Sequence, residues 1–363
     1  MRNGLIAENR AGLDSELIST VGGQETRDSV PAAAELEAAG VEVRLFRRSR
    51  LLGRGEAWGL SLPLVWWLAR NVRKYDVVHL QYVWCLTSIA GAILSRLAGI
   101  PLVMTPHESL TAFDTEVASR HPLLKLMKRL IRPLYMRSVD RLILMSGLEQ
   151  RDTDAGHIPV RIVSHAVLEE PVEEKPAGPA AGDHLRIAFI GRNIEKKGLH
   201  LLLEAIALSP EGRRHLTIAG PPPTEEYRAW LEAIISEHGL REQVEWTGYV
   251  DDREGYLRAA SVLAMPSAYE GFGMVAAEAM CCGVPVVVPE NSGVAEIVTE
   301  FDAGVVMPES TAGALDAALA AFEQDHGLAA EKGANGLEAA NARLTFDAFA
   351  TGTKRVYLEL IQA

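Results

Sequence analysis

Short apolar runs alternate along the chain with longer stretches in which apolar residues recur at helical spacing. The runs predict buried strands, because apolar residues, many of them β-branched, follow one another with few polar breaks. Five runs precede residue 169 and five follow residue 183: VEVRLF, DVVHLQ, PLVMTPH, RLILMS and VRIVSH, then LRIAFIG, LTIAG, VEWTG, SVLAMPS and VPVVVP. Continuous apolar strands separated by helices imply parallel sheets with helices on both faces.

A break in this pattern divides the chain. The segment EEPVEEKPAGPAAGD, Glu169 to Asp183, is rich in Pro, Gly, Ala and charge and has no apolar period, which is typical of an exposed linker. We therefore predict an α/β chain of two doubly wound, Rossmann-like domains, residues 1–168 and 184–345. The two domains are expected to face a cleft at the carboxyl ends of their strands. Residues 346–363 are expected to form a helix that packs back on the first domain.

Composition adds two constraints. The length of 363 residues and the apolar content of 48% agree with two well-buried cores. The charge is unevenly divided, because residues 1–168 hold 21 Lys and Arg against 17 Asp and Glu, whereas residues 169–363 hold 15 against 31. An acidic second half argues against a nucleic-acid partner. The three cysteines show neither disulfide nor metal spacing and favour a reducing cytoplasm.

Two apolar segments could suggest a membrane span. They are WGLSLPLVWWLA, residues 58–69, and VWCLTSIAGAIL, residues 83–94. At 12 residues each, they are too short to cross a bilayer, so we expect both to belong to a protein core.

Two basic residues follow the first strand of the second half. In GRNIEKKGLHLLLEAI, Arg192 and Lys197 lie in a loop, and Gly198 opens a helix predicted over residues 199–208. The amino end of a helix favours anions, and two cations beside it would hold a pyrophosphate. The alternative is a solvated loop with surface cations. Their position between a strand and a helix of an acidic domain favours the anion site.

The stretch SAYEGFGMVAAEAMCCGVPVVVP, residues 267–289, predicts a loop, a helix, a turn and a buried strand. Its bend, residues 271–273, leaves backbone N–H groups free at the helix start, which is a second anion site. Glu278 on the helix would lean back toward this end, where a carboxylate can hold ribose hydroxyls. Glu270 would then reach the group beyond the phosphates. Two glutamates at this spacing are usually surface charges, and only the strand-loop-helix-strand context favours the site.

These segments, with LTIAG, VEWTGYV and SGVAEIV, resemble the nucleotide-sugar domain of retaining glycosyltransferases of the GT-B fold. Within that fold the resemblance is to the family-4 type, the glycosyl transferases group 1. It runs through nearly all of residues 185–310 and more loosely through residues 40–168.

The resemblance implies roles for individual residues. Arg192 and Lys197 would bind the donor diphosphate, Glu270 would contact the transferred sugar as a catalytic residue, and Glu278 would take the ribose hydroxyls. The donor would also lie against the backbone of Gly271, Phe272 and Gly273. No cofactor is implied beyond the nucleotide-diphosphate sugar as co-substrate, and no metal, because protein cations hold the diphosphate. The D-x-D sequence at Asp152 to Asp154 is discounted as a metal site, since no strand leads into it.

The first half contains YDVVHLQYVW and GIPLVMTPHESL, which resemble the acceptor-side domain of the same family. His107 lies just past a strand end, where family members place a histidine against the donor sugar and phosphate, so the resemblance implies a catalytic role. The alternative is a hydrogen-bonded loop histidine without such a role. His79, within its strand, is expected to be packed. The sequence VSHAV, residues 163–167, stands where the family often has Pro-Asn-Gly.

A basic amphipathic helix is predicted within HPLLKLMKRLIRPLYMR, residues 121–137. Its cations are Lys125, Lys128, Arg129 and Arg132, and apolar residues line another face. Such a helix suits an anionic leaflet, although an ordinary packed helix with a solvated face is the alternative. The resemblance implies a saccharide or lipid-linked acceptor. We therefore expect a cytoplasmic protein, peripheral on the inner membrane face.

The function implied is transfer of a sugar from a nucleotide-diphosphate sugar to a hydroxyl acceptor with retention of anomeric configuration, in cell-surface polysaccharide or glycolipid synthesis. One alternative is a nucleotide-sugar epimerase of the same fold. Another is a degenerate, non-catalytic protein that binds the nucleotide sugar. The sequence does not specify the base, the sugar, the acceptor or the oligomeric state.

The amino-terminal sequence departs from the family pattern. Family members open with a strand, a glycine-rich loop, a helix and a second strand, whereas MRNGLIAENRAGLDSELIST resembles that helix followed by the second strand. VEVRLF would then be the third strand. We therefore expect the first domain to lack its first strand and glycine-rich loop, which leaves neighbouring strands without a shared partner. The alternative takes SELISTVGGQE as the first strand and loop, with Gly22-Gly23 as the donor loop.

Overall fold

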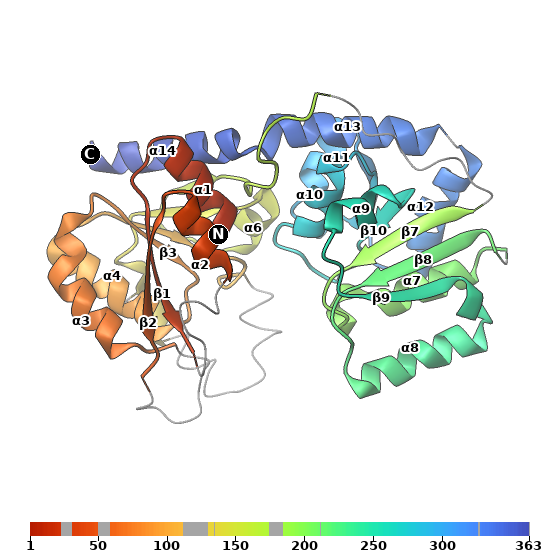
Figure 1. Cartoon of the computed structure of the whole chain (residues 1–363), viewed down its shortest axis with the longest axis horizontal. Coiled ribbons are helices and arrows are strands. Elements are labelled where there is room, and N and C mark those ends of the chain that lie inside the picture. Colours follow the sequence, from red (N-terminus) through yellow and green to blue (C-terminus); the bar gives the residue numbers. More distant parts are fainter. Residues whose placement is uncertain are drawn as a thin grey trace. The chain divides into compact units, whose positions relative to one another are not determined.

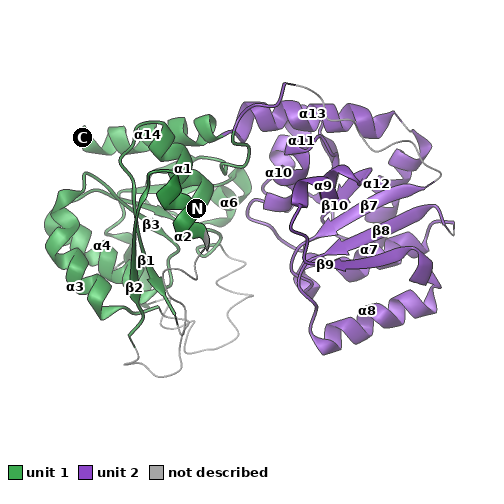
Figure 2. Cartoon of the chain, viewed as in Figure 1, with its two compact units in different colours: residues 1–169, 346–363 green, residues 170–345 purple. Residues whose placement is uncertain are grey.

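The described chain forms two compact units, residues 1–169 with 346–363, and residues 170–345 (Figures 1 and 2). This computed structural model describes residues 1–22, 31–49, 59–111, 130–133, 135–173, 184–210, 212–325 and 327–362. Each unit is an α/β assembly of parallel strands flanked by helices. The predicted α/β fold class with parallel sheets is thus confirmed.

The described strands of the first unit fall into two parallel sheets, β1–β2 and β3–β4–β5–β6. Their bounds are β1 Glu16–Val21, β2 Glu42–Arg47, β3 Val78–Gln81, β4 Leu102–Thr105, β5 Arg141–Leu144 and β6 Val160–Ile162. Among these strands no ladder joins β1 to β3, and both have mostly half-buried residues, whereas every residue of β4 is buried. The expectation that two strands of this unit lack a shared neighbour stays a prediction. Gly23, from the alternative register, lies outside the described residues.

Helices cover the sheets of the first unit. They are α1 Arg2–Arg10, α2 Pro31–Ala38, α3 Leu62–Asn71, the 3-10 helix η4 Val72–Lys74, α4 Leu86–Ala98, α6 Gly147–Asp152 and α14 Phe346–Ile361. Although α14 ends the chain, it packs on α1 through a cluster that includes Ala7, Phe346 and Ala350 (Figure 1). The last helix therefore belongs to the first unit (Figure 2).

The second unit contains one six-stranded parallel sheet in the order β12–β11–β10–β7–β8–β9. The strands are β7 Leu185–Ile190, β8 Arg214–Ala219, β9 Val244–Gly248, β10 Val262–Ala264, β11 Val286–Pro289 and β12 Gly304–Met307. The strand order reverses between β7 and β10, because β8 and β9 extend the sheet on one side while β11 and β12 extend it on the other. Open α/β sheets bind ligands outside the carboxyl ends of the strands at such a switch point.

The helices of the second unit pack on both faces of this sheet (Figure 1). They are η6 Glu195–Lys197, α7 Leu199–Ala207, α8 Glu225–Glu237, η7 Leu240–Glu242, α9 Arg253–Arg258, α10 Met274–Cys281, α11 Ala295–Phe301, α12 Ala312–Gln324 and α13 Leu328–Arg343. The inner face of α7 buries Leu199, Leu202 and Leu203 completely in the core. Each such leucine contributes about 1.5–3 kcal/mol relative to an exposed one.

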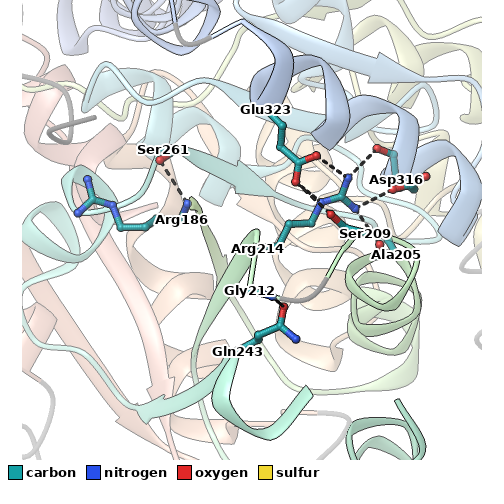
Figure 3. A network of polar contacts seen from close by, with 9 residues as sticks. All are labelled: Arg186, Ala205, Ser209, Gly212, Arg214, Gln243, Ser261, Asp316 and Glu323. Carbon is teal, nitrogen blue, oxygen red and sulfur yellow. Dashed lines mark hydrogen bonds and ion pairs between the residues drawn. The ribbon is translucent and has the colours of Figure 1, made fainter. Parts of the chain in front are cut away.

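One buried cation ties β8 to α12 and α7 (Figure 3). The Arg214 side chain is 1% exposed, and its Nε lies 2.7 Å from Glu323 Oε1. Its Nη1 lies 2.8 Å from Asp316 Oδ1 and donates to the carbonyl of Ala205 at 2.8 Å. A buried charge is tolerated when it is paired and hydrogen-bonded in this way. This cluster is structural, because all of its bonds join elements of one unit.

The two apolar segments of the sequence become α3 and α4, and only their inner faces are core. Leu64 and Leu68 are buried, whereas Trp66 on the outer face of α3 is 59% exposed and Leu97 on α4 is 75% exposed. The expectation that both segments belong to the core is therefore only half right, since each helix is amphipathic. None of the described helices combines the length and apolarity that a bilayer span requires.

Candidate active site

Three loops meet at the switch point of the second unit. They follow β7, β10 and β11, which are neighbours or near neighbours in the sheet, so their carboxyl ends lie on one edge. The N–H of Ala268, after β10, donates to the carbonyl of Lys196, after β7, at 2.8 Å. The N–H of Gly293, after β11, donates to the carbonyl of Glu270 at 2.9 Å. Backbone hydrogen bonds thus hold the predicted loops together before any ligand is considered.

These loops bring Lys197 and Glu270 into an ion pair between Lys197 Nζ and Glu270 Oε1. Their side chains are 21% and 12% exposed, so the pair is largely shielded from water. Lys197 ends η6 and Glu270 precedes the start of α10 by four positions. The sequence analysis assigned one residue to the diphosphate and the other to the sugar, and the structure makes them direct neighbours.

Glycines at two helix starts allow the loops to approach this closely. Gly198, which caps α7, has φ of 72°, and a Cβ there would lie 2.1 Å from the carbonyl oxygen of Pro266. Gly273, which caps α10, has φ of 101°, and its Cβ would lie 2.9 Å from Met265 Cε. Glycine suits both positions, because it adopts the left-handed conformation readily and has no Cβ that would clash. Both helices therefore begin at the same edge as the Lys197–Glu270 pair, and their amino ends favour an anion there.

Glu278, the fifth residue of α10, has a partner that the sequence analysis did not identify. Its Oε2 lies 3.0 Å from Nη2 of Arg253, the first residue of α9, without hydrogen-bond geometry. Burial raises the pKa of Glu278, and the charge of Arg253 opposes that rise. No local pattern links two residues 25 positions apart, so the pair could not be read from spacing.

The same loops carry three further polar residues. Arg192 and Asn193 lie on the loop after β7, and Ser267 lies after β10. Arg192 is exposed, and no described residue pairs with its guanidinium. The neighbouring Asn193 is 3% exposed and donates from Nδ2 to the carbonyl of Pro221 at 2.8 Å, while its Oδ1 has no partner among the described residues. Ser267 Oγ is also buried and also has no hydrogen-bond partner among the described residues.

In the first unit, His107 follows β4 in a left-handed conformation with φ of 48°. Its Nε2 lies 2.7 Å from Oε1 of Gln81. Its ring is tilted against that of Tyr82, with centroids 4.8 Å apart, and stacks with that of His165 at 6.0 Å. Burial lowers the pKa of His107 to about 4, so its imidazole is neutral. Non-glycine residues with positive φ are uncommon and cluster at functional sites. The sequence analysis missed Gln81, Tyr82 and His165 because they lie on other elements.

The predicted membrane helix lies mostly beyond the described chain. Lys125, Lys128 and Arg129 lie outside the described residues, and Arg132 pairs with Asp154 at 3.0 Å. Asp152 ends α6, so a helix and not a strand leads into the D-x-D sequence. Asp154, its last member, is already held by Arg132.

Comparison with known proteins identifies the family. The model described as glycosyl transferases group 1 matches residues 172–339, and the model described as glycosyl transferase 4-like domain matches residues 7–166. A D-inositol 3-phosphate glycosyltransferase from Xylanimonas cellulosilytica is 30% identical over 318 residues, which cover 80% of this chain and 73% of the relative. The chain belongs to the glycosyl transferases group 1.

A further relative and two solved structures agree with this assignment. A 2-deoxystreptamine glucosyltransferase from Streptomyces kanamyceticus is 29% identical over 72% of this chain and 71% of its own length. The structure of HepE from Anabaena in complex with UDP has a TM-score of 0.76 at 21% identity, over 99% of this chain and 96% of that chain. A glycosyltransferase from Rickettsia africae has a TM-score of 0.77 at 13% identity, covering 99% and 94%. These likenesses show the fold, which is that of GT-B glycosyltransferases.

Proposed function

We propose that this group 1 glycosyltransferase moves a hexose or amino sugar from a nucleotide-diphosphate sugar to a hydroxyl acceptor, with retention of anomeric configuration. The observation that carries the proposal is the Lys197–Glu270 pair at the switch point, between the amino ends of α7 and α10. A cation, two helix dipoles and a carboxylate at one edge suit a ligand with a diphosphate at one end and hydroxyls at the other.

Each residue has a distinct part in the proposed reaction. The bond from the anomeric carbon to the diphosphate oxygen breaks, and the acceptor oxygen bonds to the same face of that carbon. The acceptor proton passes to the departing diphosphate oxygen. Lys197 and Arg192 stabilise the charge that grows on the diphosphate, which is the largest contribution in sites of this kind. Glu270 orients the sugar, and His107 is proposed to contact the sugar as well.

Glu278 is proposed to take the ribose hydroxyls, and Arg253 to orient its carboxylate. The rise in the pKa of Glu278 reflects its burial, which is the environment in which a bond from a hydroxyl to a carboxylate gains strength. The backbone of Gly271, Phe272 and Gly273 would lie beside the donor at the start of α10. The protein cations make a metal unnecessary for holding the diphosphate in this scheme.

We also propose contact with an anionic membrane surface and a saccharide or lipid-linked acceptor, in cell-surface polysaccharide or glycolipid synthesis. One relative is named a lipopolysaccharide core biosynthesis mannosyltransferase, from Rhizobium leguminosarum. Among the described residues, support comes from the outer faces of α3 and α4, where Leu62, Trp66, Ile93 and Leu97 are all exposed. Residues 57–107 contain four Lys and Arg and a single acidic residue. Exposed Trp and Leu beside cations suit an anionic interface.

The experiment that tests the transfer is nucleotide release with and without an acceptor, in excess EDTA. The proposed function predicts that release of the nucleoside diphosphate requires a hydroxyl acceptor and persists in EDTA. Formation of the epimeric sugar or nucleotide sugar without an acceptor would favour the epimerase alternative. Binding of the donor with no release under any condition would favour a non-catalytic binding protein. Loss of release in EDTA would overturn metal independence.

A further inference from the structure

A continuous chain of hydrogen bonds crosses the interior of the first unit and ends at His107. It begins at Glu8 on α1, whose Oε1 accepts from the hydroxyl of Tyr357 on α14 at 2.8 Å. The Tyr357 oxygen lies 2.7 Å from Nδ1 of His79 on β3. His79 Nε2 lies 3.3 Å from Gln81 Nε2, and Gln81 Oε1 lies 2.7 Å from Nε2 of His107. Three elements, α1, α14 and β3, and the loop after β4 therefore contribute to one polar path.

The donor and the acceptor of each hydrogen bond along this path follow from Glu8, where the path begins. Glu8 is 5% exposed and also accepts from Ser15 Oγ at 3.1 Å. Burial raises the pKa of Glu8, and the hydrogen bonds from Tyr357 and Ser15 oppose that rise. The Tyr357 hydroxyl donates to Glu8, so its oxygen is then free only to accept from a second partner. His79 must therefore carry its proton on Nδ1.

The tautomer of His79 in turn determines the tautomer of His107. With its proton on Nδ1, neutral His79 presents a lone pair at Nε2, which accepts from the hydroxyl of Thr105 at 2.8 Å and from the amide of Gln81. Burial lowers the pKa of His79 to about 3, which keeps the ring neutral. The Gln81 amide then directs its oxygen at His107, which must donate from Nε2. No described residue bonds Nδ1 of His107, so this nitrogen is left as an acceptor.

We propose that Glu8, Tyr357, His79 and Gln81 are positioning residues that hold His107 as the Nε2–H tautomer, and so leave Nδ1 to accept a hydrogen bond from a sugar hydroxyl. The sugar contact rests on the proposed function, whereas the tautomer is a property of the protein alone. Buried polar networks of this kind hold one arrangement when every member is satisfied. The strained backbone of His107, the tilted ring of Tyr82 and the stacked ring of His165 fix the ring plane, and the hydrogen-bond chain fixes the proton.

The proposal gives α14 a reason to return to the first unit. Tyr357 is 278 positions from His79, and only the packing of α14 on α1 brings its hydroxyl between Glu8 and His79. Removing the phenolic oxygen leaves the Nδ1 proton of His79 without an acceptor. His79 would then move its proton to Nε2 and donate to Thr105, the Gln81 amide would turn over, and His107 would become the Nδ1–H form.

Long-range proton–nitrogen correlation spectra of the imidazole rings, in ligand-free protein with labelled histidine, test this inference. The chain has 10 histidines, and the spectrum of a His107→Gln variant assigns the signals of His107. We expect a protonated Nε2 and a bare Nδ1 at His107 in the wild type. In Tyr357→Phe the Nδ1–H form is expected to become the major one.

A second variant and a control distinguish an effect of this hydrogen-bond path from a general disturbance of the structure. Glu8→Leu keeps the tyrosine but removes its acceptor, so it should shift the His107 tautomer in the same direction. Tyr256→Phe removes another buried tyrosine hydroxyl, which bonds the carbonyls of Phe189 and Thr217 in the second unit, and should leave His107 unchanged. A wild-type His107 protonated at Nδ1, or spectra unchanged in both Tyr357→Phe and Glu8→Leu, would overturn the proposal. Because the spectra need no substrate, a failure of the glycosyl-transfer hypothesis would leave this result standing.

Discussion

Lys197 and Glu270 form an ion pair although 73 positions separate them in the sequence. The pair joins the loop after β7 to the loop after β10, on either side of the point where the strand order reverses. Both side chains are mostly buried, so neither charge is fully hydrated. A ligand with a diphosphate can replace Glu270 as the partner of Lys197 and free the carboxylate for the hydroxyls of a sugar.

The two glutamates of the site should differ in what they bind. Glu270→Ala is expected to abolish transfer while the nucleoside diphosphate still binds, because Glu270 is proposed to contact only the sugar. Glu278→Ala should weaken nucleotide binding by about 1–3 kcal/mol through the lost charged hydrogen bond. Titration calorimetry with the free nucleoside diphosphate measures both. Equal loss of affinity in the two variants would contradict this division of roles.

The two cations should act on the diphosphate and not on the nucleoside. Arg192→Ala and Lys197→Ala should each weaken binding of the nucleoside diphosphate by about 1.5–3 kcal/mol, the size of a hydrogen bond to a charged group. The affinity for the bare nucleoside should change little. Arg241→Ala, which removes a mostly exposed cation of the same unit, is the matched control. An equal effect on both ligands would show that the loop has only a structural role.

Much of this site follows from the local sequence, because a strand, a glycine bend and a helix occupy one continuous segment. The predicted helix over residues 199–208 and the predicted strand in VPVVVP correspond to α7 and β11. What the sequence does not encode locally is the pairing of polar side chains on separate elements. Arg253 beside Glu278, and Tyr357 beside His79, depend on tertiary packing, which has no periodic signal. The short strand β12, GVVM, was also missed.

Exposure of α3 shows a second limit of sequence reasoning. The segment is apolar enough to be read as core, yet one face of the helix carries Leu62 and Trp66 in solvent. Periodicity is hard to detect when both faces of a helix are apolar. Only the packing of Leu64 and Leu68 on their neighbours shows which face is inside.

The buried Arg214 cluster should be the strongest polar contribution to the stability of the second unit. Glu323→Ala leaves the guanidinium with Asp316 as its one carboxylate partner among the described residues and should lower the free energy of unfolding by about 3 kcal/mol. Hydrogen exchange of the β8 amides measures the loss locally. The control is Glu300→Ala, which breaks the half-exposed pair with Arg343 and should change stability by less than about 0.5 kcal/mol. Equal protection of β8 in both variants would refute the assignment.

Membrane contact through α3 and α4 should depend on the exposed indole and on lipid charge. Trp66→Ser should weaken binding to anionic vesicles by roughly 1–2 kcal/mol, about five- to thirtyfold, because the ring no longer enters the interface. Tyr249→Ser, at a 78% exposed aromatic residue of the second unit, is the matched control. Flotation with anionic and neutral vesicles at two salt concentrations measures the binding. Binding that ignores lipid charge, ionic strength and Trp66 would refute the contact.

The central claim is that the loops around Lys197 and Glu270 hold a nucleotide-diphosphate sugar. It is tested most directly by a thermal-shift panel of UDP-, GDP-, ADP- and dTDP-sugars on the wild type and on Lys197→Ala. A ligand that binds only the folded state raises the melting temperature progressively with its concentration. We predict that at least one of these sugars stabilises the wild type in this way, and that the stabilisation is largely lost in Lys197→Ala. The absence of stabilisation by all four sugars, or equal stabilisation of wild type and variant, would contradict the claim.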